Sequence, residues 1–338
     1  MGGTLDRRAL LGAAMTAAAG GGAVAQEASA PAPAAAAPRA SAAEPRQKGP
    51  RVWLDMDQQE LDDAYDQAKY APNIAQVVGR YASNSAAARA RLGAPLRLAY
   101  GATPIEGIDL YPTRQPNAPV QIFIHGGAWR RGLASDYGFL AENFVHAGAH
   151  YLAVDFNNVG ETNGDLMPMA DQVRRAIAWV YRNAESFGGD ARRLYLSGHS
   201  SGAHLAGVAL VTPWQDYGVP DDIIKGALCC SGMYDLKAPR LSARSNYVQF
   251  TDAMEDALST QRHLARINCP VVVAYGTNET PEFQRQNREF AAALKAAGKP
   301  VELLVGEGYN HFEMCETLAN PYGLTGRAAL AQMHLAPA

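Results

Sequence analysis

A serine between two glycines is the residue of this chain with the clearest chemical potential. In the stretch YLSGHSSGAHLAG, residues 195–207, Ser200 stands at the centre of a G-x-S-x-G pattern. An apolar run typical of a strand precedes the pattern, and a helix-forming run follows it. Small residues two positions to either side let strand and helix approach closely, so the turn exposes the central hydroxyl. We interpret Ser200 as a nucleophile, since Ser197 and Ser201 occupy the wrong positions in this turn.

Such a serine needs help, because its hydroxyl is a weak nucleophile at neutral pH. The chain must supply a base, an acid that orients the base, and donors for a developing oxyanion. The donors are predicted at His125–Trp129, a glycine turn after the expected strand Val120–Ile124. This turn can aim the backbone N–H groups of Gly127 and Ala128 at the reacting carbonyl, with the N–H of Ser201 as a further donor. The sequence therefore predicts an oxyanion hole formed by these three residues.

The acid and the base are predicted on two later loops. Glu279 lies at the tip of the loop after the expected strand Val271–Tyr275, and His311 lies on the loop after Val301–Val305. Serine, then acid, then histidine is one of the chain orders in which this set of groups occurs. His311 would take the Ser200 proton, and Glu279 would hold the ring tautomer and stabilise the imidazolium.

Other assignments remain open for some of these groups. Glu282, one helical turn beyond Glu279, and Asp235, after the preceding strand, are alternative acids. His125 and His199 lie within the two motifs, so we expect them to support or line a pocket. The other histidines are interpreted as structural or exposed: His146, His150, His204, His263 and His334. The side chains predicted to contact substrate are Trp129 after the oxyanion turn, His199, Phe312 after the base, and Tyr65 from an early helix.

The elements that must position these residues alternate between strand and helix. The expected strands are Leu96–Tyr100, Gly107–Tyr111, Val120–Ile124, Tyr151–Asp155, Leu194–Leu196, Ile224–Cys230, Val271–Tyr275 and Val301–Val305. Helix-period segments between them are Met169–Ala184, His204–Val211, Glu282–Ala297 and Gly326–Met333. This order favours an α/β fold with a mostly parallel sheet and helices on both faces. Residues 51–92 are predicted to be helical and to form a flap over one end, and residues 232–250 form an insertion of the kind that selects substrate.

Composition and charge exclude one class of partner. The 338 residues are 48% hydrophobic, and the formal net charge is -3. A nucleic-acid-binding surface normally carries a clustered basic excess, which is absent from this sequence. The cysteines lack metal-site spacing and are interpreted as mostly buried small apolar residues: Cys229, Cys230, Cys269 and Cys315.

The N-terminal residues are predicted to form an export signal followed by a linker. Residues 1–25 resemble a twin-arginine export signal, with Arg7 and Arg8 ahead of an apolar stretch and an A-x-A-like cleavage site. The segment is too short and too rich in glycine for a stable membrane span. Residues 26–50 are rich in alanine and proline, which indicates a linker, so the catalytic domain is predicted over residues 51–338. We therefore expect export by the twin-arginine machinery to a bacterial periplasm.

Four ordered motifs together resemble the α/β-hydrolase superfamily, in its esterase and arylformamidase (kynurenine formamidase-like) branch. The motifs are His125–Trp129, Gly198–Gly202, Glu279–Phe283 and Asn310–Phe312. The resemblance covers nearly all of the chain from Arg51, and it implies the α/β-hydrolase fold, an eight-stranded, mostly parallel sheet, a Ser/acid/His triad and no metal. The chain departs from the pattern at two places. Many relatives carry Asp where Glu279 stands, and Asp155–Asn158 replaces a Tyr-Arg pair that such esterases often show.

The predicted reaction is hydrolysis of a small carboxylic ester by acyl transfer. Ser200 would attack the carbonyl, the N–H groups of the oxyanion hole would bind the tetrahedral oxyanion, and His311 would protonate the leaving group and then activate water. No cofactor is required. Hydrolysis of N-formyl aryl amines is the alternative, and a lyase or a non-catalytic binding protein on the same fold is a more remote one. The sequence leaves the oligomeric state open.

Overall fold

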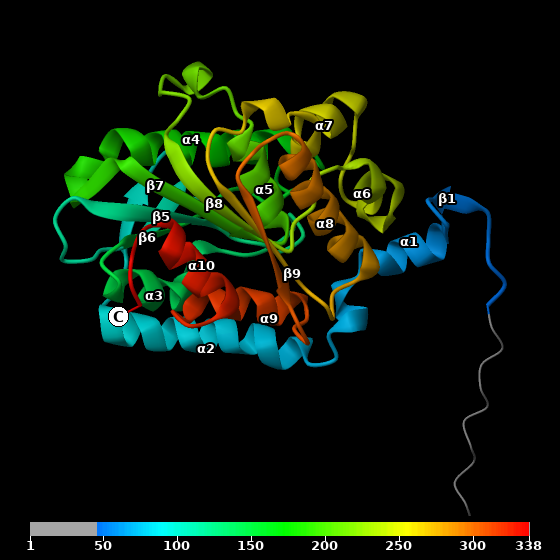
Figure 1. Ribbon diagram of the computed structural model, residues 1–338, viewed down its shortest axis with the longest axis horizontal. Coiled ribbons are helices and arrows are strands. Elements are labelled where there is room, and N and C mark those ends of the chain that lie inside the picture. The colour runs from blue at the N-terminus through cyan, green and yellow to red at the C-terminus, as the bar shows by residue number, and fades with distance from the viewer. Residues whose placement is uncertain (1–45, 338) are drawn as a thin grey trace, which may run out of the picture. The chain divides into compact units, whose positions relative to one another are not determined.

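Eight apolar segments form one sheet in the computed structural model, which describes residues 46–337. The strand order is β10-β9-β8-β7-β5-β6-β4-β3 (Figure 1). Neighbouring strands are parallel except for β4, which is antiparallel to both β3 and β6. The strands are β3 Leu96–Ala99, β4 Gly107–Tyr111, β5 Ala118–Ile124, β6 His150–Val154, β7 Gly189–His199, β8 Ile224–Cys230, β9 Val271–Gly276 and β10 Val301–Gly306. The predicted eight-stranded, mostly parallel sheet is confirmed.

Both faces of this sheet are buried under helices. On β5, Ile122 and Ile124 enter one core and Phe123 enters the other, because successive side chains of a strand point to opposite faces. Helices α4, α5 and α8 cover the first face, and α2, α3, α9 and α10 cover the second (Figure 1). Their bounds are α2 Ile74–Leu92, α3 Ala141–His146, α4 Met167–Asn183, α5 Ser201–Leu210, α8 Pro281–Ala296, α9 His311–Glu316 and α10 Leu324–Gln332. This double coverage explains why the central strands carry apolar residues on both of their faces.

The segment ahead of the sheet is not helical throughout. Arg51–Trp53 (β1) and Met56–Asp57 (β2) pair as a small antiparallel hairpin, which differs from the helix predicted there. The first helix, α1 (Gln58–Ala64), begins only after this hairpin, because Asp57 and Glu60 form a capping box. The Asp57 side chain accepts from the Glu60 N–H, and the Glu60 side chain accepts from the Asp57 N–H. Two short helices, α6 (Lys237–Leu241) and α7 (Asp252–Ala257), lie in the insertion after β8 and beyond it.

The loops that carry the predicted site residues leave the sheet at one edge. The parallel register pairs Ile124 of β5 with Gly198 of β7, and Gly276 of β9 with Gly306 of β10. Each of these residues is the last or second-last residue of its strand. The turns after β5, β7, β9 and β10 therefore meet at the carboxyl edge of the sheet, where ligands bind in open α/β sheets.

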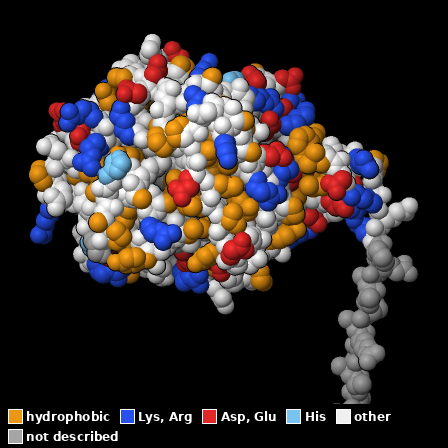
Figure 2. All heavy atoms as spheres, viewed as in Figure 1, with side chains coloured by type: hydrophobic (Ala, Val, Ile, Leu, Met, Phe, Trp, Pro, Cys, Tyr) orange, Lys and Arg blue, Asp and Glu red, His pale blue; other side chains and the backbone are white. Residues whose placement is uncertain are grey.

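The surface carries charges of both signs. Figure 2 shows Lys and Arg side chains intermixed with Asp and Glu on the visible face, which agrees with the small net charge of -3. The four cysteines are free and buried, as predicted. Burial raises the pKa of the Cys315 thiol to about 12, so this group stays a neutral thiol.

The predicted export signal and nearly all of the predicted linker lie outside the described residues. Within the described range, no helix is both long and apolar enough to cross a membrane.

Candidate active site

Ser200 occupies the turn between β7 and α5 with backbone angles that few L-residues adopt. Its φ is 59° and its ψ is -126°, and its N–H donates to the Cys230 carbonyl at 2.9 Å. A Cβ at Gly198 would lie 2.4 Å from the Gly202 carbonyl oxygen, and one at Gly202 would lie 2.1 Å from the Ile124 oxygen. Only glycine therefore permits this approach of strand and helix. The strained backbone persists because the packing around it allows no other arrangement.

His311 connects the Ser200 hydroxyl to a carboxylate. Its Nε2 lies 2.8 Å from Ser200 Oγ, and its Nδ1 lies 2.7 Å from Glu279 Oε2. An ionised carboxylate can only accept, so Nδ1 carries the proton and Nε2 accepts from the serine hydroxyl. The Asn310 side chain caps α9 by accepting from the Phe312 N–H at 3.0 Å, which fixes His311 in the first turn of that helix. This arrangement is the one a general base requires.

Glu279 is 1% exposed and is held from both of its oxygens. Besides the His311 contact on Oε2, its Oε1 accepts from the Ser231 hydroxyl at 2.6 Å and from the Gly276 N–H at 2.7 Å. These donors fix the orientation of the carboxylate toward the imidazole. The carboxylate is thus positioned by the end of β9 and by the residue that follows β8.

The two alternative acids have other partners. Glu282 is fully buried and accepts from Arg285 Nε at 2.6 Å and from Arg285 Nη2 at 2.8 Å. Asp235 forms an ion pair of 3.0 Å with Arg262. Of the three acids considered from the sequence, only Glu279 forms a hydrogen bond with the imidazole.

The turn after β5 presents backbone donors beside Ser200. Gly127, Ala128 and Trp129 have φ values of 125°, 56° and 63°. A Cβ at Gly127 would lie 1.9 Å from the Arg131 carbonyl oxygen, so no other residue fits. The Ser201 hydroxyl accepts from the Trp129 N–H at 3.2 Å and so fixes the turn to α5. Within residues 46–337, the N–H groups of Gly127, Ala128 and Ser201 donate to no other protein group, which leaves them free for a ligand oxygen.

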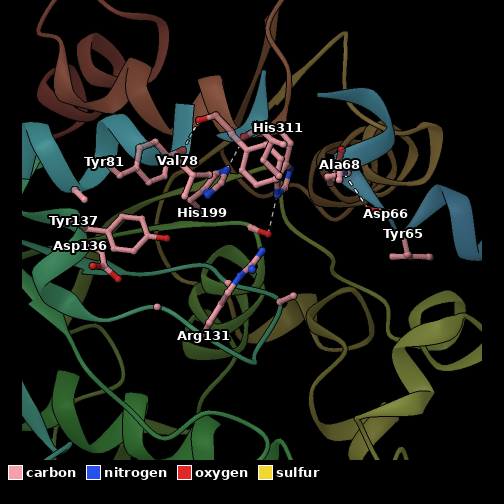
Figure 3. A pocket seen from close by; sticks show the side chains of 18 of the residues that line it. Tyr65, Asp66, Ala68, Val78, Tyr81, Arg131, Asp136, Tyr137, His199 and His311 are labelled. Carbon is pink, nitrogen blue, oxygen red and sulfur yellow. Dashed lines mark hydrogen bonds between the residues drawn. The ribbon is translucent and has the colours of Figure 1, made fainter. Parts of the chain in front are cut away.

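A cavity of about 410 Å³ opens beside Ser200. This volume is in the range of small-molecule sites, about 300–1,000 Å³. Figure 3 shows His199 and His311 on one side of the cavity, Arg131 opposite them, and Tyr137 at one flank. Residues between Tyr65 and Ala82, from the segment ahead of the sheet, form another wall.

A protein-family model described as BD-FAE matches residues 108–322 of this chain. The chain belongs to the BD-FAE family. It is 33% identical to the kynurenine formamidase of Danio rerio over 282 residues, which cover 79% of this chain and 94% of that protein. It is also 26% identical to an isoprenylcysteine alpha-carbonyl methylesterase of Arabidopsis thaliana over 241 residues, 64% of this chain and 56% of the relative. The predicted esterase and arylformamidase branch of the α/β-hydrolases is confirmed.

A solved structure supports the same fold. The thermophilic esterase Est2 of Thermogutta terrifontis, with propionate bound, superposes with a TM-score of 0.58 at 21% identity. The match covers 73% of this chain and 97% of the esterase. This similarity supports the α/β-hydrolase fold, and the relatives of this BD-FAE protein identify it as a hydrolase of the ester and amide type.

The substrate contacts predicted for this BD-FAE protein divide into two groups. Tyr65, His199 and Phe312 line the cavity, and their contact with substrate stays a prediction. Trp129 does not line it, contrary to the prediction, and its side chain is only 2% exposed. The positive φ of Trp129 directs its indole toward α5, where Nε1 donates to His204 Nδ1 at 3.2 Å. The Trp129 side chain therefore anchors the turn after β5 to helix α5.

Two arginines in the cavity wall, Arg131 and Arg244, and one tyrosine, Tyr137, were not predicted. Arg131 is the second residue after the motif His125–Trp129, so its place in the chain was a signal. Arg244 lies within the insertion of residues 232–250, which the sequence marks only as a segment that selects substrate.

His199 is a neutral support for the base. It is 4% exposed, and burial, followed by the nearby His311, lowers its pKa to about 3. A carbonyl can only accept, so the His199 Nε2–H donates to the His311 carbonyl at 2.8 Å. This bond holds the backbone of the base, and it leaves Nδ1 without a proton.

His204 provides a test of these buried imidazoles through the pH dependence of stability. Burial lowers its pKa from 6.5 to about 4, more than the hydrogen bond to the Leu258 carbonyl at 2.9 Å raises it. The unfolded state binds more protons between these two pKa values, so stability falls as pH is lowered through this window, by about 1.4 kcal/mol per pH unit for one histidine. We expect His204→Asn to flatten the dependence of the unfolding free energy on pH between 6.5 and 4 relative to the wild type. Equal slopes in denaturant titrations of the two proteins would contradict this.

Proposed function

We propose that this protein is a serine hydrolase that cleaves small carboxylic esters through an acyl-enzyme. The supporting observation is the continuous chain of hydrogen bonds from Ser200 Oγ through His311 to Glu279, with distances of 2.8 and 2.7 Å. The serine lies in the wall of the cavity, next to three backbone N–H groups that donate to no other described protein group. Nucleophile, base, orienting acid and oxyanion donors are the parts that acyl transfer needs.

In the first step, Ser200 Oγ attacks the ester carbonyl while its proton passes to His311 Nε2. The carbonyl π electrons move onto the oxygen, and the N–H groups of Gly127, Ala128 and Ser201 bind the resulting oxyanion. Removing one such donor typically costs about 10² to 10³ in rate. Collapse of the intermediate breaks the bond to the leaving oxygen, which takes the proton from His311.

In the second step, water replaces the alcohol and His311 acts again as the base. The water proton passes to Nε2, the hydroxide oxygen attacks the acyl carbon, and the proton returns to Ser200 Oγ as the acid leaves. Throughout, Glu279 faces the Nδ1–H and stabilises the imidazolium that forms in each step.

A second candidate substrate class is the N-formyl aryl amine. It is favoured by the 33% identity to a kynurenine formamidase over 79% of this chain. The same residues would act, and proton donation by His311 would matter more, because an amine is a poorer leaving group than a phenolate. The two candidates therefore differ in substrate and not in mechanism.

The test uses initial rates of hydrolysis of an aryl acetate and of formanilide, together with labelling by a serine-directed aryl phosphonate. We expect turnover of the ester and a single phosphonate adduct, located by peptide mass spectrometry on Ser200. A strong preference for formanilide would assign the protein to the arylformamidases. Turnover without an adduct on Ser200 would overturn the proposed acyl-enzyme.

We also propose that the protein acts outside the cytoplasm, after export by the twin-arginine machinery and removal of residues 1–25. The support is the arginine pair and the cleavage-site pattern in the sequence. Fractionation of bacterial cells that produce the full chain, with N-terminal sequencing of the protein, tests this. A cytoplasmic protein with an intact N-terminus would contradict it.

A further inference from the structure

A buried cation without a charged partner lines the cavity beside Ser200. Arg244 lies in a 3₁₀ turn, Ala243–Asn246, between β8 and α7, and is only 6% exposed. It is nevertheless one of the residues that line the cavity. A guanidinium remains protonated in proteins, so the positive charge is present at every relevant pH.

The protein groups that contact this guanidinium are neutral. Arg244 Nη1 donates to the Tyr247 hydroxyl at 2.8 Å, and Nη2 donates to the Tyr65 carbonyl at 3.4 Å. Nε is buried and has no acceptor. Within residues 46–337, Arg244 forms no ion pair, and most of its five N–H donors are unused.

Aromatic rings surround the charge and orient it. Arg244 Cζ lies 5.3 Å from the ring centroid of Trp129, 5.5 Å from that of Tyr65 and 5.9 Å from that of Phe283. Cation–π contacts at these distances compensate only part of the lost hydration. Phe283 also contacts the ring of His311 edge-on, with centroids 4.9 Å apart, so one ring lies against both the cation and the base, and both of these line the cavity.

The acids near Arg244 are engaged elsewhere. The Glu282 carboxylate accepts a hydrogen bond from the Tyr65 hydroxyl. Its charge is paired with Arg285, whose Nε and Nη2 both donate to it. The two acids that line the cavity accept from backbone N–H groups, Asp66 from Ala68 and Asp136 from Leu133. None of these carboxylates forms an ion pair with Arg244.

We propose that Arg244 binds a carboxylate of the substrate, so that the ester or formamide carries a free carboxylate away from the scissile carbonyl. This inference rests on the proposed function. A carboxylate matches the fork of a guanidinium, and it would supply the negative charge that none of the acids named above supplies to Arg244. Burial makes such an ion pair selective, because a neutral group in the same place would leave the charge unpaired.

The kinetic test compares matched substrates that differ by one carboxylate. On the acyl side the pair is para-nitrophenyl pentanoate and mono-para-nitrophenyl glutarate, and on the leaving-group side it is phenyl acetate and meta-acetoxybenzoate. We expect the wild type to prefer the carboxylate in one of the pairs, through KM. In Arg244→Gln, the ratio of kcat/KM values for that pair should fall about 10- to 100-fold. No preference in either pair, or a preference that survives the substitution, would overturn the proposal.

Three further variants control this result. Arg240→Gln removes an arginine of the same insertion that is paired with Asp252 and Glu255 outside the cavity, so the ratio should stay as in the wild type. Arg131→Gln removes the other cavity arginine, and loss of the preference in this variant alone would overturn the assignment to Arg244. If Arg244→Gln fails to fold, Arg244→Lys tests the same point, because it keeps the charge but loses the planar fork and should reduce the ratio.

A binding measurement separates this inference from the proposed function. Calorimetry on Ser200→Ala with benzoate and with benzamide requires no turnover. We expect benzoate to bind about 10-fold more tightly or better, and Arg244→Gln in the same background to remove the difference. Equal affinities for benzoate and benzamide would overturn the carboxylate site even if the proposed hydrolysis is confirmed. Tighter benzoate binding in a protein whose hydrolysis survives Ser200→Ala would retain the site and reject the mechanism.

Discussion

Ser200→Ala is expected to lower kcat for ester hydrolysis by about 10⁴- to 10⁶-fold, with little change in KM. The substitution removes the hydroxyl oxygen that forms the acyl bond in the proposed mechanism. The cavity and the free N–H groups of the oxyanion turn stay in place, so substrate binding is kept. Steady-state rates at enzyme concentrations high enough to detect residual turnover give the measurement.

The effect should not add to that of the base. In the proposed mechanism His311 takes the proton of Ser200, whose Oγ lies 2.8 Å from Nε2, so Ser200→Ala/His311→Ala should be about as slow as either single variant. Ser197→Ala is the matched control, because the Ser197 hydroxyl accepts from Gln121 at 2.7 Å, on the neighbouring strand and away from the imidazole. A Ser200→Ala rate within about 10-fold of the wild type would exclude the serine as nucleophile.

Much of the fold could be predicted because the sheet is buried on both faces. Continuous apolar runs such as Val271–Tyr275 match the observed strands, here β9. One difference is Arg51–Asp57, where a hairpin replaces the predicted helix, and another is His311, which begins α9 and does not lie on a loop. At the hairpin the deciding feature is the Asp57–Glu60 capping box, a local polar signal that apolar periodicity does not register.

The site could be predicted as far as backbone order determines it. Turns at the carboxyl ends of neighbouring parallel strands must meet, so Ser200, Glu279 and His311 were brought together by topology alone. The direction of side chains could not be predicted in the same way. The Trp129 side chain points toward α5 because the residue has a positive φ. A positive φ is uncommon in residues other than glycine, so the sequence did not predict it.

The burial of Arg244 could not be predicted from the sequence either. An arginine in a polar insertion is usually solvated. Its burial here depends on three rings contributed by separate elements: Tyr65 after α1, Trp129 after β5 and Phe283 in α8. Contacts between residues so far apart in the chain arise only once the fold has formed.

Glu279→Gln is expected to lower kcat by about 10⁴-fold while the protein stays folded. The amide keeps the size of the side chain but loses the charge that stabilises the imidazolium of His311. It can also place its NH₂ group against Nδ1, which would favour the tautomer with the proton on Nε2 and block acceptance from Ser200. Glu279→Asp tests reach, because the shorter side chain cannot contact Nδ1, Ser231 and the Gly276 N–H together at the observed distances.

Glu282, one of the two alternative acids, provides the matched control for Glu279→Gln. Glu282→Gln leaves the Arg285 charge without its buried partner, so the unfolding free energy should fall by about 3 kcal/mol while kcat changes less than about 10-fold. Denaturant titrations and rates on the same preparations separate the two effects. If Glu282→Gln instead lost catalysis and Glu279→Gln lost only stability, the acid would have to be reassigned. The observed contacts argue for the first outcome, because catalysis requires a carboxylate on Nδ1 and Glu279 is the acid that occupies that position.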